Sequence, residues 1–252
     1  INEFSFINSL SQVRIINGRE EGIYGWLATN YLKDTFTSSS TSIGLIEMGG
    51  ASMQITFEPS KQLPAILIDG HNDPDSIIYL TLNQQKYTLY THSYLDYGLE
   101  AAQVLFQQKN INNIENDGNP CYPIGYKHSS TGNYHQCKQL MKDIFHFNVP
   151  SNQKEEGASE EDENTCPFPN QSCGFNNIYQ PQIEHEDFLA IENFFYTSDF
   201  FQIDTDTDNN DHILSQLKSK GQQYCTEDWN TLRERYTTEE EYSLSKYCLK
   251  FL

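Results

Sequence analysis

Hydrophobic positions fall at helical spacing near the start of the chain and then in short runs. Between Glu20 and Asp34 apolar and aromatic side chains recur three and four positions apart, and acidic residues open the segment where a helix dipole favours them. This pattern predicts a helix over 20–34. The apolar run 43–48 and the alternating run 52–57 predict two strands joined by a tight turn at Gly49-Gly50.

The rest of the chain predicts more strands first and helices later. Residues 77–82 and 87–91 predict strands around a polar turn at 83–85, and apolar spacing predicts an amphipathic helix over 95–108. Six acidic residues between 150 and 165 predict a solvated surface loop. Later helical patterns cover 186–201, 212–223, 227–236 and 239–250. Together they predict a mixed α/β domain with helices packed around a central sheet.

The charge of the chain limits its partners. The formal net charge is −19, which argues against nonspecific binding to nucleic acid or to an anionic membrane surface. No run of eighteen apolar residues occurs, so no membrane-spanning helix is predicted and no membrane contact is expected from this segment. An anionic small-molecule substrate would need a local site of backbone N–H groups and a metal cation instead of a basic patch.

Six cysteines, all after Pro120, predict disulfides. Six cysteines allow fifteen pairings, and their order favours the neighbours Cys121–Cys137, Cys166–Cys173 and Cys225–Cys248. Free thiols or metal ligands are the alternative, but the tight Cys-x-x-Cys pairs with matching His of a structural zinc site are missing. A glycosylation sequon at Asn170 points the same way, toward a secreted, extracellular or lumenal protein.

The first predicted hairpin carries candidate chemistry. The glycines Gly49 and Gly50 let backbone N–H groups approach a phosphate closely. Glu47, just before them, could hold a divalent cation through water. Ser52 and Gln54 are alternate residues of the returning strand, so they share a face and could bind one water. The alternative is a plain hairpin turn with an acidic flank.

Several motifs together resemble the apyrase, or nucleoside triphosphate diphosphohydrolase, family over nearly all of the chain. The stretch Gly18-Arg19-Glu20-Glu21-Gly22-Ile23-Tyr24-Gly25-Trp26, with Asn30-Tyr31-Leu32, resembles the family's third signature region, and 47–54 resembles its fourth. Downstream, Tyr90-Thr91-His92-Ser93-Tyr94-Leu95, Tyr97-Gly98 and Phe194-Phe195-Tyr196-Thr197 keep the family's order.

The resemblance implies an actin/hexokinase-like (ribonuclease H-like) fold, in which two related α/β domains close on a nucleotide. Residues 1–252 would form the second, C-terminal domain, with a central mixed sheet, a phosphate-binding hairpin and flanking helices. The family's N-terminal domain and last signature region are absent from this sequence. The phosphates are expected at Gly49, Gly50, Ala51 and Ser52.

The resemblance also implies roles in the hydrolysis of terminal phosphates of nucleoside tri- or diphosphates. Glu21 matches the general base, Ser52 and Gln54 match residues that position the attacking water, and Tyr196 matches an aromatic that stacks on the nucleotide base. The cofactor would be Ca²⁺ or Mg²⁺, held by Glu47 through water. Glu47 stands where the family has aspartate, and this longer side chain is a departure that bears on metal binding.

Two other functions remain to be weighed. A structural or interaction module in an oligomer or extracellular assembly would keep the fold without the reaction, and the change at Glu47 favours it. Retention of Glu21, Ser52 and Gln54 together argues against it, because a scaffold needs none of the three. A sugar or glycerol kinase of the same superfold is disfavoured, since such kinases lack the Glu-Glu-Gly-x-Tyr-x-Trp helix start.

Overall fold

The computed structural model describes residues 13–37, 41–61, 63, 76–127, 130–145, 173–205 and 210–250. The predicted acidic loop, Cys166 and Asn170 lie outside these residues. The early elements are α1 (Gly18–Leu32), β1 (Gly44–Met48), β2 (Ser52–Phe57), β3 (Ile77–Leu82), β4 (Gln85–Leu95), α3 (Leu99–Asp117) and α4 (Tyr134–Phe145). The later ones are the 3₁₀ turn η4 (Phe175–Asn177), β5 (Phe188–Glu192), α5 (Asn193–Phe200), α6 (Asn210–Cys225), α7 (Trp229–Arg235) and α8 (Glu241–Lys250).

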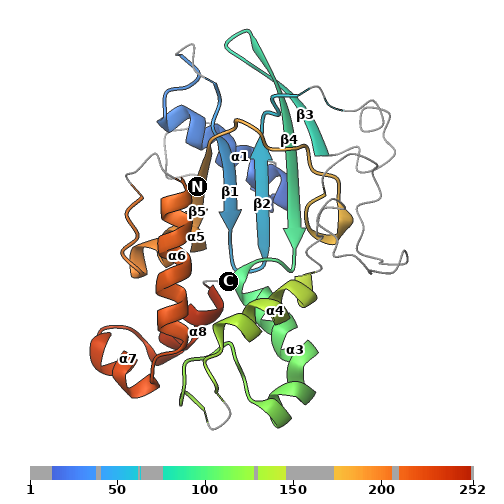
Figure 1. Ribbon diagram of the computed structural model, residues 1–252. Helices are drawn as coiled ribbons and strands as arrows, with labels where there is room; N and C mark the ends of the chain where they lie inside the picture. Colours follow the sequence, from blue (N-terminus) through green and yellow to red (C-terminus); the bar gives the residue numbers. More distant parts are fainter. Residues whose placement is uncertain are drawn as a thin grey trace.

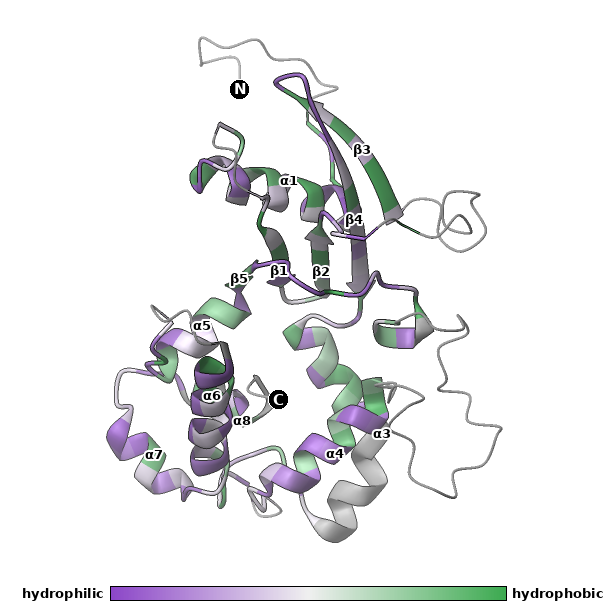
Figure 2. Cartoon of the chain, turned by 45° about the horizontal axis from the view of Figure 1, so that its top comes forward, coloured by the Kyte–Doolittle hydropathy of each residue, from purple (hydrophilic) through white to green (hydrophobic). Residues whose placement is uncertain are grey.

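The strands form one mixed sheet in the order β3-β4-β2-β1-β5 (Figure 1). The pairs β3–β4, β4–β2 and β2–β1 are antiparallel, and β5 joins β1 in parallel. Beyond the end of the sheet where β1 turns into β2 lie two groups of helices. Helices α3 and α4 form one group and α5 to α8 the other, as both views show (Figures 1 and 2). The predicted mixed α/β architecture is therefore confirmed.

Helix α1 lies flat on one face of the sheet, against β1, β2 and β4. Its start is fixed by a capping box, in which Asn17 Oδ1 accepts from Glu20 N at 2.9 Å and Glu20 Oε2 accepts from Asn17 N at 3.1 Å. Gly22 allows the close packing, since a Cβ there would lie 2.7 Å from Thr56 Oγ1. Beneath it the hydroxyls of Thr56 and Thr91 are hydrogen-bonded at 2.7 Å.

The end of α1 is tied to the start of β1 through the buried side chain of Asn30. Its Nδ2 donates to Trp26 O at 2.9 Å and to Ile43 O at 2.8 Å. Its Oδ1 accepts from Ile43 N at 2.8 Å and from Thr35 Oγ1 at 2.7 Å. A buried side-chain amide whose nitrogen and oxygen are both hydrogen-bonded is held in one orientation. It therefore fixes α1 relative to the strand that leads into the glycine turn.

The sequence prediction of the second hairpin was wrong in its bounds. The turn has two residues, Asn83 and Gln84, and β4 runs on to Leu95 because each residue from Tyr90 to Leu95 pairs with β2. Both turn residues have positive φ, 48° and 69°, as in the tight turns that match the twist of a hairpin.

Replacing Gln84 by glycine is expected to stabilise the protein by about 0.5–1 kcal/mol. A non-glycine residue in the left-handed backbone conformation costs about 1–2 kcal/mol. Glycine avoids this cost, but the extra conformational entropy that it gives the unfolded chain offsets about half of the gain. The free energy of unfolding in urea would be measured beside Gln85→Gly, which places glycine in a strand and should destabilise. A Gln84→Gly protein less stable than wild type would contradict this account of the turn.

Two further predictions are corrected by the structure. The segment predicted as a helix over 186–201 begins as strand β5, because Phe188–Glu192 pairs with β1, and turns helical at Asn193. The helix predicted over 95–108 is α3, which runs from Leu99 to Asp117, and α4 was not predicted. The last three helices were predicted to within two residues at each end.

Two predicted disulfides are present, Cys121–Cys137 and Cys225–Cys248. The first joins the segment after α3 to α4, and the second joins the end of α6 to α8. Cys173 is also disulfide-bonded. Of the helices in the described ranges, none combines the length and apolar character needed to span a bilayer.

Candidate functional site

The glycine turn between β1 and β2 is held from behind by the first turn of α3. The carbonyl of Gly49 accepts from Leu99 N at 3.0 Å, and that of Gly50 accepts from the amides of residues 100 and 101 at 2.9 and 3.0 Å. The turn thus caps backbone donors that a helix start leaves unsatisfied. On another side, Asn193 Nδ2 donates to the carbonyls of Met48 and Gly49.

Of the three amides predicted to bind phosphate, that of Gly49 is not available, because it donates to Ser52 O at 3.0 Å. Gly50 and Ala51 are exposed, and within the described residues their N–H groups have no acceptor. Successive unpaired amides form a concave site that favours an anion. The turn predicted as a phosphate cradle therefore has the donors for that purpose.

The three residues predicted as base and water-positioning groups meet at one point. Gln54 Nε2 lies 2.8 Å from Glu21 Oε2 and 2.8 Å from Ser52 Oγ. Gln54 is almost fully buried at 1% exposure, while Glu21 and Ser52 are half-buried at the edge of the cluster. Glu21 comes from the first turn of α1 and the other two from β2, so α1 must lie flat on the sheet for the cluster to form.

Two adjacent glutamates at the start of α1 have different surroundings. Glu20 is hydrogen-bonded to the Arg14 guanidinium and to the Asn17 amide, and these hold its pKa at about 2. Its carboxylate is committed to capping the helix. Glu21 instead faces Gln54, so of the two only Glu21 lies beside the water-positioning groups.

Glu47 lies on the same face of the sheet, because it pairs directly with Gln54 in the antiparallel register. Burial raises the pKa of Glu47, and the nearby carboxylates of Glu21 and Glu192 raise it further. A divalent cation would relieve this repulsion, so the carboxylate oxygens of Glu47 and its neighbours fit a bound cation. No group of three His, Cys, Asp or Glu in the described part of the chain is placed to ligate a metal directly.

Tyr196 lies on α5, apart from this cluster. The residue is 54% exposed, and its ring meets that of Phe195 edge-on, with centroids 5.6 Å apart. No hydrogen bond or ring contact in the described residues joins it to Glu21, Ser52 or Gln54. Asn193, at the start of the same helix, is hydrogen-bonded to the carbonyl of Met48 beside the glycine turn. Tyr196 therefore lies about one helical turn beyond that contact.

Sequence reasoning assigned no role to two residues at the site, Ser93 and Asn193. Ser93 pairs with Gln54 across β2 and β4, and its Oγ lies 3.1 Å from Gln54 Nε2. Ser93 lies in a motif that resembles the family, but the sequence pattern does not align β4 with β2, and that pairing is what brings Ser93 to Gln54.

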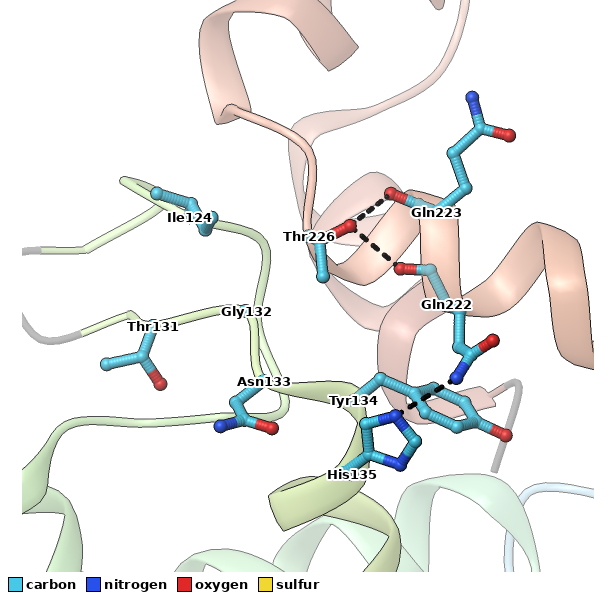
Figure 3. Close-up of a pocket in the computed structure, with 9 residues that line it drawn as sticks. All are labelled: Ile124, Thr131, Gly132, Asn133, Tyr134, His135, Gln222, Gln223 and Thr226. Carbon is cyan, nitrogen blue, oxygen red and sulfur yellow. Dashed lines mark hydrogen bonds between the residues drawn. The ribbon is translucent and has the colours of Figure 1, made fainter.

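A surface pocket of about 460 Å³ lies elsewhere, between Ile124 and residues 131–135 on one side and the end of α6 on the other (Figure 3). Polar side chains line much of it, and His135 Nε2 lies 3.2 Å from Gln222 Nε2. No predicted site residue lines it. The glycine turn and its carboxylates remain the candidate active site.

The mixed sheet, the glycine hairpin and the helix across one face define an actin/hexokinase-like α/β domain. A solved structure of nucleoside triphosphate hydrolases from Neospora caninum is similar in fold, with a TM-score of 0.56 and 14% identity over 89% of this chain and 53% of that one. The chain belongs to the GDA1/CD39 (nucleoside phosphatase) family, whose profile matches residues 1–252.

Similar curated proteins carry consistent names. Ectonucleoside triphosphate diphosphohydrolase 2 from Gallus gallus is 29% identical, over 93% of this chain and 50% of that protein. Probable apyrase 3 from Arabidopsis thaliana is 31% identical, over 93% and 48%. Ectonucleoside triphosphate diphosphohydrolase 1 from Bos taurus is 26% identical, over 98% and 51%. The chain spans about half the length of these relatives.

Proposed function

We propose that this chain forms the second domain of an apyrase-type enzyme that removes terminal phosphates from nucleoside tri- or diphosphates. The observation that carries the proposal is the cluster of Glu21, Ser52 and Gln54 beside a glycine turn in which two exposed amides have no acceptor among the described residues. The names of the relatives support nucleotides as the substrates. A preceding domain would supply the other side of the site.

In this mechanism the hairpin binds phosphate oxygens through the amides of Gly50 and Ala51 and the hydroxyl of Ser52, while the amide of Gly49 donates to Ser52 O at 3.0 Å and closes the turn. A water held by Ser52 and Gln54 lies next to the Glu21 carboxylate. Glu21 takes its proton as it attacks phosphorus, and the leaving nucleotide departs on the opposite side. Transfer of phosphate to water mostly requires such positioning and neutralisation of charge on the phosphate.

A divalent cation, Ca²⁺ or Mg²⁺, would neutralise phosphate charge at the site. Glu47 would hold it through water, as its half-buried position among carboxylates suits. A cation also explains how a chain of net charge −19 accepts an anionic substrate. Tyr196, exposed on α5, would stack on the nucleotide base.

The cysteines and the sequon at Asn170 support an extracellular or lumenal location with glycosylation at that asparagine. A second candidate function is an apyrase-like structural module without efficient catalysis. The observation in its favour is Glu47, whose longer side chain replaces aspartate at the metal position and whose pKa is raised.

Phosphate release from ATP and from ADP by the full-length protein tests the proposal. We expect release in Ca²⁺ or Mg²⁺ that a chelator abolishes and excess cation restores. No release by a folded protein with intact disulfides would overturn the enzyme proposal and favour the structural module.

A further inference from the structure

The environment of Gln54 contains one more oxygen than its amide nitrogen can fully bind. Three oxygens surround Nε2: Glu21 Oε2 at 2.8 Å, Ser52 Oγ at 2.8 Å and Ser93 Oγ at 3.1 Å. An amide nitrogen carries two hydrogens. The three acceptors therefore compete for two donors.

The position of the carboxylate also fixes which way the amide faces. An ionised carboxylate accepts hydrogen bonds and donates none, so the nitrogen of Gln54 must face Glu21. No described residue donates to Gln54 Oε1, which leaves that oxygen for a water. The direction of Oε1 then depends on what holds Nε2 at the other end.

We propose that Ser93 is a positioning residue for the attacking water, an inference that rests on the proposed hydrolysis. Ser93 accepts from Gln54 Nε2 on the β4 side and so holds the amide in place. Without Ser93 both hydrogens would go to Ser52 and Glu21, and the amide would turn toward them.

The packing of α1 over this hydroxyl supports the assignment. Gly18, the first residue of α1, passes so close that a Cβ there would overlap Ser93 Oγ and lie 2.7 Å from Ser93 Cβ. The same Cβ would lie 3.4 Å from Gln54 Nε2. The Ser93 hydroxyl is thus confined between a helix start and the Gln54 amide, and its position is fixed by backbone on one side.

Steady-state kinetics of the full-length protein on ATP would test the role, with Ser93→Ala and Ser93→Thr. For Ser93→Ala we expect a fall in kcat of about tenfold, with KM and Tm nearly unchanged, since a small misplacement of a reacting group is costly for rate and not for binding. Ser93→Thr keeps the acceptor and should restore most of kcat.

Thr91→Val is the matched control, because Thr91 shares the strand face with Ser93 but bonds to Thr56 instead of Gln54. It should lower Tm and leave kcat near wild type. Gly18→Ala should lower kcat on its own and much less in the Ser93→Ala background, because both changes act on one hydroxyl.

The outcomes separate the two proposals. An active wild type with an unchanged kcat in Ser93→Ala would overturn the positioning role and leave the hydrolase intact. A rise in KM at constant kcat would also overturn the positioning role, because it would mean that Ser93 contacts the bound substrate instead. A wild type that releases no phosphate would overturn both.

Discussion

Replacing Glu21 by glutamine is expected to lower phosphate release by about 100-fold or more. General-base catalysis contributes about 10²–10⁴-fold, and an amide cannot take the proton of the attacking water. The substitution keeps the size of the side chain, and the amide oxygen can still accept from Gln54 Nε2. The loss should therefore appear in kcat, with little change in Tm or in the KM for ATP.

The neighbouring Glu20→Gln is the matched control for this experiment. Glu20 caps α1 and pairs with Arg14, and glutamine also serves in a capping box. It should leave kcat near wild type and lower stability slightly. If Glu21→Gln retained kcat within tenfold of wild type, Glu21 would not be the base.

Part of this site could be predicted from local pattern. The period of two along a strand places Ser52 and Gln54 on one face, and the glycine turn follows from the sequence alone. The contact between Glu21 and Gln54 spans 33 positions, and no periodicity predicts it. The roles expected of Glu21 and Gln54 follow from the resemblance to a family. The physical cause of their contact is the close packing of α1 on the sheet at Gly22.

The errors arose where tertiary pairing overrides local pattern. Phe188–Glu192 is a short apolar run followed directly by a helix, and such a run does not distinguish strand from helix. Its pairing with β1 decides the matter. Ser93 was left without a role for the same reason, since its position opposite Gln54 depends on β4 pairing with β2.

The glycine turn depends on a residue outside the turn itself. Gly98 lies between β4 and α3, and a Cβ there would lie 2.5 Å from Ala51 N, from Ala51 C and from Gly50 C. All three are backbone atoms, so no side chain can rotate away to relieve the overlap. The chain has no room for any other residue at this position unless the turn and α3 separate.

Replacing Gly98 by alanine is therefore expected to cost about 3 kcal/mol of stability and about 100-fold in kcat. Separation would weaken the bonds from Leu99, Glu100 and Ala101 to the turn carbonyls, each worth about 1 kcal/mol. It would also displace the amides that are proposed to bind phosphate by about 1 Å, which is enough for a loss of that size. Urea unfolding and ATP hydrolysis would be measured on the same preparation.

Gly50→Ala provides the comparison for stability, because its Cβ would meet the flexible carboxylate of Glu100 at 3.4 Å and no backbone. It should unfold at nearly the wild-type urea concentration. A Gly98→Ala protein with wild-type stability and kcat would mean that the turn can shift against α3 without consequence. The amides of Gly50 and Ala51 would then owe their position to β1, β2 and Asn193 alone.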